Sequence, residues 1–300
     1  LQEPEMTRGN SGFVLCVSGI ALMCGMDAVA KALGASFSPF QIVFMRYLGA
    51  ALWLALWIFS SKGAWPRIDD MGRQALRAVM LVATASLFFF AVTHLPLAAV
   101  AALGMTAPVY MTLLGALFLK ENMRGGAWLA LALGIAGSAV IVLGGGALET
   151  NNPLGGAPLA WTAAALAPVT YAVTMALLKH HSGQEEPAAM SLGQSLIAAL
   201  LVLPLAFGPL PEINASLAGQ SALIGFLGAL GFLLLLHGLK RMPVSAFAVL
   251  DYSGLVWAAF FGFIFFQEVP GLQFWLGALL IVSACAFNAR RPVPEPVVEH

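Results

Sequence analysis

The chain contains an internal repeat. Residues 96–139 align without a gap with residues 243–286, and 12 of these 44 positions are identical. The identical pairs include Pro96 with Pro243, Gly115 with Gly262, Glu121 with Glu268 and Trp128 with Trp275. A weaker match, at a shift of 148 residues, pairs Lys31 with Lys179. Because nearly every residue between these landmarks is apolar, the repeat favours a membrane protein whose two similar halves enclose a site for a solute.

The composition agrees with a membrane protein. Of the 300 residues, 60% are hydrophobic and 9% are charged, whereas about 25% are charged in an ordinary globular domain. The 14 basic and 14 acidic residues cancel, so no charge excess points to nucleic acid as a partner. The three cysteines all lie in apolar stretches, and an odd number of such thiols does not indicate a disulfide framework.

Ten stretches are long enough to cross a bilayer, which requires about 20 apolar residues for a helix. The predicted spans are 12–33, 40–60, 75–94, 97–119, 126–145, 157–178, 188–208, 220–239, 244–266 and 270–289. We therefore expect an all-α integral membrane fold of two five-helix repeats around a central cavity. The predicted parts are an N-terminal tail at 1–11, repeats at 12–145 and 157–289, and a C-terminal tail at 290–300.

The basic residues predict the orientation of the chain. With the N-terminus in the cytoplasm, 12 of the 14 Lys and Arg residues fall on the cytoplasmic side, as the positive-inside rule requires. The exceptions are Lys31 and Arg46, which lie toward the outer side. Because five helices per repeat is an odd number, we expect the second repeat to be inverted, with Glu121 facing the cytoplasm and Glu268 facing outside. Both termini are then cytoplasmic, and the inverted repeat predicts transport by alternating access.

Two charged residues occupy similar depths in the first two predicted spans. Asp27 lies six residues before the outer end of its span, roughly 9 Å by helical rise, and Arg46 lies about as deep from the same side. A charge at such a depth costs about 2.5–3.5 kcal/mol unless it is satisfied. The favoured interpretation is a structural ion pair that orients the two helices, which Lys31 could join. The alternative is that Arg46 holds the carboxylate of a substrate.

A second candidate site lies in the ninth predicted span. Asp251 is close to the cytoplasmic end of this span, and His237 ends the eighth span on the same side. A carboxylate beside an imidazole could relay protons or bind a substrate ammonium group. The competing interpretation is that Asp251 accepts hydrogen bonds from helix ends while His237 lies among lipid headgroups.

Uncharged residues at similar depths complete the predicted cavity. Its expected lining, which includes Asp251, is otherwise thioether and aromatic: Met105, Tyr110, Tyr171, Tyr252 and Trp257. Pro108 removes a backbone hydrogen bond and Gly254 only loosens its helix, so these two positions are the predicted hinges. The histidines and cysteines do not have the spacing of metal ligands, and no cofactor is expected. The fifth and tenth spans, rich in small residues, are expected to pack peripherally or to form the contact of a homodimer.

Several short segments resemble a known family in their order, spacing and duplication. They are Phe44-Met45-Arg46-Tyr47, Ala107-Pro108-Val109, Gly115 to Glu121, Gly134-Ile135-Ala136-Gly137, Gly262 to Glu268 and Gly277-Ala278-Leu279-Leu280. With them the chain resembles the EamA-type, ten-helix branch of the drug/metabolite transporter superfamily over essentially its whole length. The resemblance implies export of small metabolites, with exporters of amino acids, including aromatic ones, among its best-known ten-helix members. The chain departs from the pattern where Gln194 aligns with Arg46 and where Leu255 replaces the proline opposite Pro108.

The expected function is export of amino acids or similar small metabolites across the cytoplasmic membrane of a bacterium. A mostly uncharged lining costs little when it desolvates a zwitterion with an apolar side chain, whereas phosphorylated cargo requires several Arg or Lys at depth. Multidrug efflux within the same superfamily is the alternative function. An intramembrane enzyme is a remote alternative, because the sequence has no Gly-x-Ser-x-Gly and no recognisable Ser-His pair.

Overall fold

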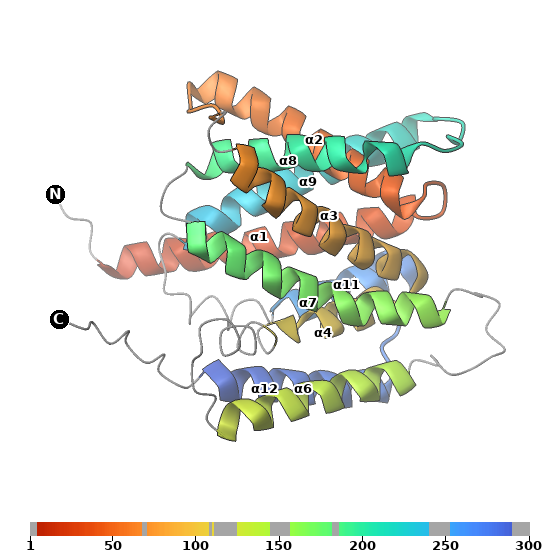
Figure 1. Ribbon diagram of the computed structural model, residues 1–300. Helices are drawn as coiled ribbons and strands as arrows, with labels where there is room; N and C mark the ends of the chain where they lie inside the picture. Colours follow the sequence, from red (N-terminus) through yellow and green to blue (C-terminus); the bar gives the residue numbers. More distant parts are fainter. Residues whose placement is uncertain are drawn as a thin grey trace.

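The computed structural model describes residues 5–67, 71–107, 110, 125–144, 157–181, 186–239 and 253–289, which fold into helices joined by turns and loops (Figure 1). The ten helices of this part of the chain are α1 (Glu5–Leu33), α2 (Pro39–Ser61), α3 (Met71–His94), α4 (Leu97–Gly104), α6 (Gly125–Gly144), α7 (Ala157–His181), α8 (Pro187–Ala206), α9 (Ala215–Leu239), α11 (Ser253–Phe266) and α12 (Leu272–Ala289). Each lies within or overlaps one predicted span, so the all-α membrane fold is confirmed.

Local sequence signals explain where α2 begins and ends. Ser38 and Gln41 form a capping box, in which the Ser38 hydroxyl accepts from the Gln41 N–H at 3.3 Å and the Gln41 side chain accepts from the Ser38 N–H at 2.9 Å. Pro39 follows at the first helical position, where its missing N–H costs nothing. The helix ends at Lys62, whose φ of 53° is left-handed and whose N–H donates to the Ile58 carbonyl.

The fourth predicted span is not one continuous helix over 97–119. Its described beginning, α4, ends at Gly104, and the Thr106 N–H then donates to the carbonyl of Leu103, only three residues back, at 3.0 Å. The Thr106 hydroxyl also donates to Leu103 O at 2.6 Å and so competes with the helical pattern. The break lies at Met105 and Thr106, just before the predicted hinge.

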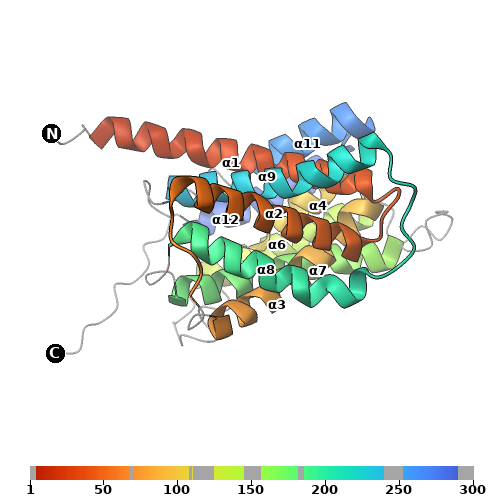
Figure 2. The same ribbon diagram turned by 90° about the horizontal axis from the view of Figure 1, so that it is seen from above.

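The helices pair across the two halves of the chain in a reciprocal way. The first helix of each half packs against the third helix of the other half. In the first half α1 lies along α9, and in the second half α7 lies along α3 (Figures 1 and 2). Corresponding helices also meet, in the pairs α2 with α8, α4 with α11 and α6 with α12. This exchange of partners is the pattern expected of two repeats related by a two-fold axis.

Glycines bring several of these helices into backbone contact. A Cβ added to Gly225 of α9 would lie 2.5 Å from the Cα of Gly49 of α2, and one added to Gly137 of α6 would lie 2.7 Å from the carbonyl oxygen of Gly277 of α12. Small residues allow such close approach in membranes. The pair α6 and α12 lies at one edge of the bundle in Figure 1, and the glycines of these two helices pack against each other.

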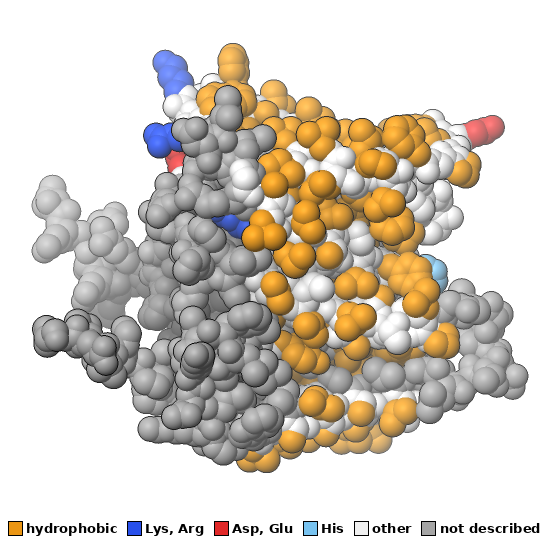
Figure 3. Space-filling view, viewed as in Figure 1, with side chains coloured by type: hydrophobic (Ala, Val, Ile, Leu, Met, Phe, Trp, Pro, Cys, Tyr) orange, Lys and Arg blue, Asp and Glu red, His pale blue; other side chains and the backbone are white. Residues whose placement is uncertain are grey.

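The surface of the bundle is apolar along the length of the helices. Figure 3 shows hydrophobic side chains over the visible middle of the molecule, with the charged groups that it colours toward the left and right ends. Large exposed side chains such as Leu56 (61%), Phe59 (78%) and Leu200 (67%) belong to this surface. Five helices of the described residues are long and apolar enough to cross a membrane by length and composition: α1, α2, α3, α8 and α9. The apolar surface therefore suits contact with lipid.

Candidate functional site

Asp27 and Arg46 lie on consecutive helices of the first repeat, α1 and α2, which both pack against α9. The carboxylate of Asp27 on α1 interacts electrostatically with the guanidinium of Arg46 on α2. Both side chains keep accessible surface. Among the described residues, the ion pair within 4.0 Å is made by Lys31 and Glu268 instead. The expected structural ion pair of Asp27 with Arg46, joined by Lys31, is therefore not formed.

Aromatic rings hold the guanidinium of Arg46. Its Cζ lies 4.9 Å from the ring centroid of Tyr47 and 5.5 Å from that of Phe89. Its Nη1 donates to the Tyr47 hydroxyl at a long 3.4 Å, and this hydroxyl donates to the Leu81 carbonyl at 3.2 Å. A guanidinium has five N–H donors, and within the described part of the chain only this one hydrogen bond uses them. The position of Arg46 is thus fixed while most of its donors stay available.

Lys31, one turn further along α1 than Asp27, is fully engaged. Its Nζ lies 2.9 Å from Oε1 of Glu268, donates to the carbonyl of Val92 at 3.1 Å and to that of Leu95, and lies 5.4 Å from the ring centroid of Phe266. These contacts tie α1 of the first repeat to the residues that follow α11 in the second. They also hold the C-terminal end of α3.

Glu268 completes the connection through its second oxygen. Oε2 of Glu268 accepts the backbone N–H of Leu97 at 2.8 Å, at the N-terminus of α4, where a helix favours a negative charge. The side chain reaches this point because α11 ends in a left-handed C-cap of the αL type. Gln267 is left-handed (φ 56°), its N–H bonds to Phe263 O at 3.1 Å, and the Glu268 N–H bonds to Gly262 O at 3.1 Å. The chain therefore turns back over the end of α11.

The sequence contained a signal for this arrangement that its analysis missed. A Cβ on Gly262 would lie 2.9 Å from Oε2 of Glu268, so a glycine leaves room for the returning carboxylate. The same glycine and glutamate recur six residues apart as Gly115 and Glu121. The predicted topology also places Lys31 and Glu268 toward the outer side of the membrane. Beside them lies a hollow of about 220 Å³, whose lining includes Glu268, Trp161, Gln273 and Phe274.

Three helices meet in the middle of the bundle at two predicted residues. A Cβ on Gly254 of α11 would lie 3.3 Å from Cε of Met105, which follows α4, and the Cys24 thiol of α1 lies 3.5 Å from the Gly254 carbonyl oxygen. Nearby helices α3 and α7 are joined by the hydroxyls of Thr84 and Thr170, which lie 3.0 Å apart. Met105 and the predicted hinge Gly254 are thus brought together.

The other predicted site residues are more dispersed. Trp257 packs in an aromatic row on α11, with ring centroids 6.0 Å from Phe260 and 6.2 Å from Phe261. His237 is exposed at the end of α9, with Nδ1 2.7 Å from the Leu233 carbonyl oxygen of its own helix. Tyr110 and Tyr171 are partly buried, whereas Pro108, Asp251 and Tyr252 lie outside the described residues. The proton relay of Asp251 with His237 therefore stays a prediction.

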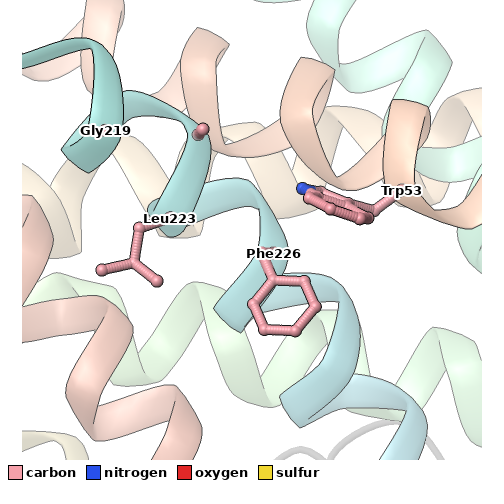
Figure 4. A pocket seen from close by; sticks show the side chains of 5 residues that line it. Trp53, Gly219, Leu223 and Phe226 are labelled. Carbon is pink, nitrogen blue, oxygen red and sulfur yellow. The ribbon is translucent and has the colours of Figure 1, made fainter. Parts of the chain in front are cut away.

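A second hollow, of about 290 Å³, lies between α2 and α9 (Figure 4). It is lined by apolar residues, among them Trp53 and Phe226, whose rings meet edge to face at 5.0 Å. Trp53 is 43% exposed and Leu223 is 41% exposed. Because none of the lining side chains carries a charge, this hollow belongs to the lipid-facing surface and is not a site for a polar solute.

A multi-span helical bundle with an apolar outside, exchanged repeats and charges at membrane depth defines a class, the membrane transporters. The comparisons with known proteins place the chain within it. The chain belongs to the EamA-like transporter family, whose model matches residues 10–143 and again residues 159–290. The resemblance to the EamA-type branch of the drug/metabolite transporter superfamily is thereby confirmed.

The chain is similar to several named transporters. It is 28% identical to the pseudopaline exporter of Pseudomonas aeruginosa, over 93% of this chain and 96% of the relative. It is 26% identical to a riboflavin transporter of Brucella anthropi, over 83% and 87%. It is 23% identical to an S-adenosylmethionine uptake transporter of Rickettsia bellii, over 87% of both. These relatives are named as transporters, in agreement with the expectation that the chain is not an enzyme.

The fold also matches a solved crystal structure. That structure aligns with a TM-score of 0.62 over 93% of this chain and 96% of its own, at 17% identity. At this identity the likeness shows the fold alone. A small-molecule substrate and a lipid bilayer are the partners that membership of the family establishes.

Proposed function

We propose that this transporter exports amino acids and similar small metabolites across the cytoplasmic membrane of a bacterium. The observation that carries the proposal is the pair Asp27 and Arg46, a carboxylate and a guanidinium at membrane depth beside aromatic and thioether side chains. One charge of each sign suits a cargo of no net charge, whereas a phosphorylated cargo requires several cations. The relative named as an exporter supports the direction, while the relative named for uptake makes direction part of the proposal.

We propose alternating access as the mechanism, with both termini in the cytoplasm. In this topology the Lys31–Glu268 pair lies at the outer end, where it joins the two repeats and holds them together. Outward opening then requires this pair to separate. Reciprocal packing of the repeats supports the mechanism, because the closed arrangement of one half can be adopted by the other.

Uptake into proteoliposomes tests the proposed cargo. Purified protein is reconstituted and supplied in turn with labelled phenylalanine, leucine, riboflavin, S-adenosylmethionine and a cationic drug, with and without a pH gradient. We expect saturable flux of the amino acids that exceeds flux into protein-free liposomes. Flux of the drug without any amino acid would establish multidrug efflux instead, and flux of riboflavin or S-adenosylmethionine alone would assign the chain a cargo of the kind named for its relatives.

A further inference from the structure

Asp27 and Arg46 carry opposite charges that no ion pair joins among the described residues. Asp27 contributes a carboxylate and Arg46 a guanidinium from about the same depth of α1 and α2, and neither forms an ion pair within 4.0 Å in the described structure. At such a depth, a charge without a direct partner costs several kcal/mol. Both side chains keep some accessible surface, so neither is sealed off by its protein neighbours.

The contacts of Arg46 determine which group of a ligand its guanidinium can bind. The rings of Tyr47 and Phe89 cover the guanidinium, at 4.9 and 5.5 Å, and limit its movement. Its planar fork of N–H donors matches the two oxygens of a carboxylate. On the neighbouring α9, Gly228 leaves room beside Arg46, because a Cβ there would lie 3.8 Å from Nε of Arg46 and 3.1 Å from Sδ of Met26. The surroundings are therefore apolar walls around one fixed cation and one anion.

We propose that Asp27 and Arg46 together form a binding site for a zwitterion, in which Arg46 holds the carboxylate and Asp27 holds the ammonium group. The proposal rests on the proposed function and names the substrate class more narrowly, as molecules that carry both charges of a free α-amino acid. The carboxylate of a zwitterion neutralises Arg46 and its ammonium group neutralises Asp27, so the occupied site carries no net charge.

Each charge makes a separate prediction about cargo chemistry. The ammonium group is absent from 3-phenylpropionate and the carboxylate is absent from phenylalanine amide, whereas phenylalanine has both. We expect wild-type protein to prefer phenylalanine to either analogue by about ten- to a hundredfold, the range for loss of one hydrogen bond to a charged group. Competition against labelled phenylalanine uptake in proteoliposomes measures these preferences without any variant.

Two variants then assign each charge to a residue. Asp27→Asn should lose the preference for phenylalanine over 3-phenylpropionate while it keeps the preference over the amide. Arg46→Gln, which introduces the residue that aligns with it in the second repeat, should show the reverse pattern. Matched controls are Glu212→Gln and Lys62→Gln, which remove the same kinds of charge at exposed loop positions and should leave both preferences intact.

The outcomes separate this proposal from the function on which it rests. If wild-type protein transports no amino acid, the proposed function fails. If it transports phenylalanine and both analogues equally well, the zwitterion site is overturned while amino-acid transport stands. The site is also overturned if both variants weaken all three ligands in parallel, because a merely structural role would have that effect.

Discussion

Asp27 and Lys31 are four residues apart on α1, so they lie on one face of the helix about 6 Å apart along its axis. Their surroundings differ greatly. Lys31 contacts a carboxylate, two carbonyl oxygens and an aromatic ring, whereas Asp27 feels Arg46 without an ion pair to it. The comparison teaches that two charges on one helix face can have opposite surroundings. Lys31 is saturated by protein contacts and joins the two repeats, whereas Asp27 makes no ion pair, as the proposed ligand site requires.

Removing Lys31 should have the largest effect on stability. Lys31→Met leaves Glu268 without its cation, and breaking a buried pair in this way costs about 3–5 kcal/mol. Because the two side chains keep 14% and 19% exposure, we expect about 2–3 kcal/mol. Denaturant unfolding in mixed micelles measures the loss.

The double variant Lys31→Met with Glu268→Gln is the control for that measurement. It should recover part of the lost stability, because the unpaired charge is gone. An unchanged free energy of unfolding in the single variant would mean that Lys31 is no more engaged than Asp27, and the contrast between the two residues would be lost.

A smaller effect is expected where Glu268 turns back over α11. In Gly262→Ala, the new Cβ meets Oε2 of Glu268 at 2.9 Å, so the carboxylate must shift from Lys31 and from the Leu97 N–H. Gly219→Ala on α9 is the matched control, because nothing lies within 4 Å of its Cβ. Alanine gains up to about 1 kcal/mol of helix propensity at either position. We expect Gly262→Ala to be less stable than the control variant by about 1–2 kcal/mol, and equal stabilities would show that the carboxylate moves freely.

The smallest change in stability should come from Asp27→Asn. Since no ion pair is lost, we expect the free energy of unfolding to change by less than about 1 kcal/mol. The variant should nevertheless transport phenylalanine poorly, which paired unfolding and uptake measurements would establish. A loss of stability as large as that of Lys31→Met would restore the interpretation of Asp27 and Arg46 as a structural ion pair.

The fold was largely predictable because each span is a continuous apolar stretch bounded by clear signals. Pro39 and Pro187 begin α2 and α8, and the turn before Pro96 separates α3 from α4. The break at Met105 was not predicted, because hydropathy does not report where backbone hydrogen bonds shift from the carbonyl four residues back to the one three residues back, as they do at Thr106.

The positions of the charged residues along their helices could be predicted from the sequence, but the residues with which they interact could not. The sequence predicted the heights of Asp27, Arg46 and Lys31 along their helices, since helical rise converts residue number into distance. It could not decide which of them would pair, because that depends on how α1 packs against helices of the other repeat. Arg77 illustrates the same limit: counted among the cytoplasmic basic residues, it is only 1% exposed within the bundle.

The packing of α1 against the second repeat has a consequence for biosynthesis. The contact of Cys24 with Gly254 joins residues 230 positions apart, and a ribosome that adds about 5–20 residues per second needs roughly 10–50 s to make that length of chain. Until α9 and then α11 have been made, a first half inserted as it is synthesised lacks the helices that cover α1 in the finished protein. Arg46 already has Tyr47 and Phe89 at that time, because both belong to the first half, whereas Lys31 still lacks Glu268. Lys31 is therefore the charge that stays unpaired until the second half has been made.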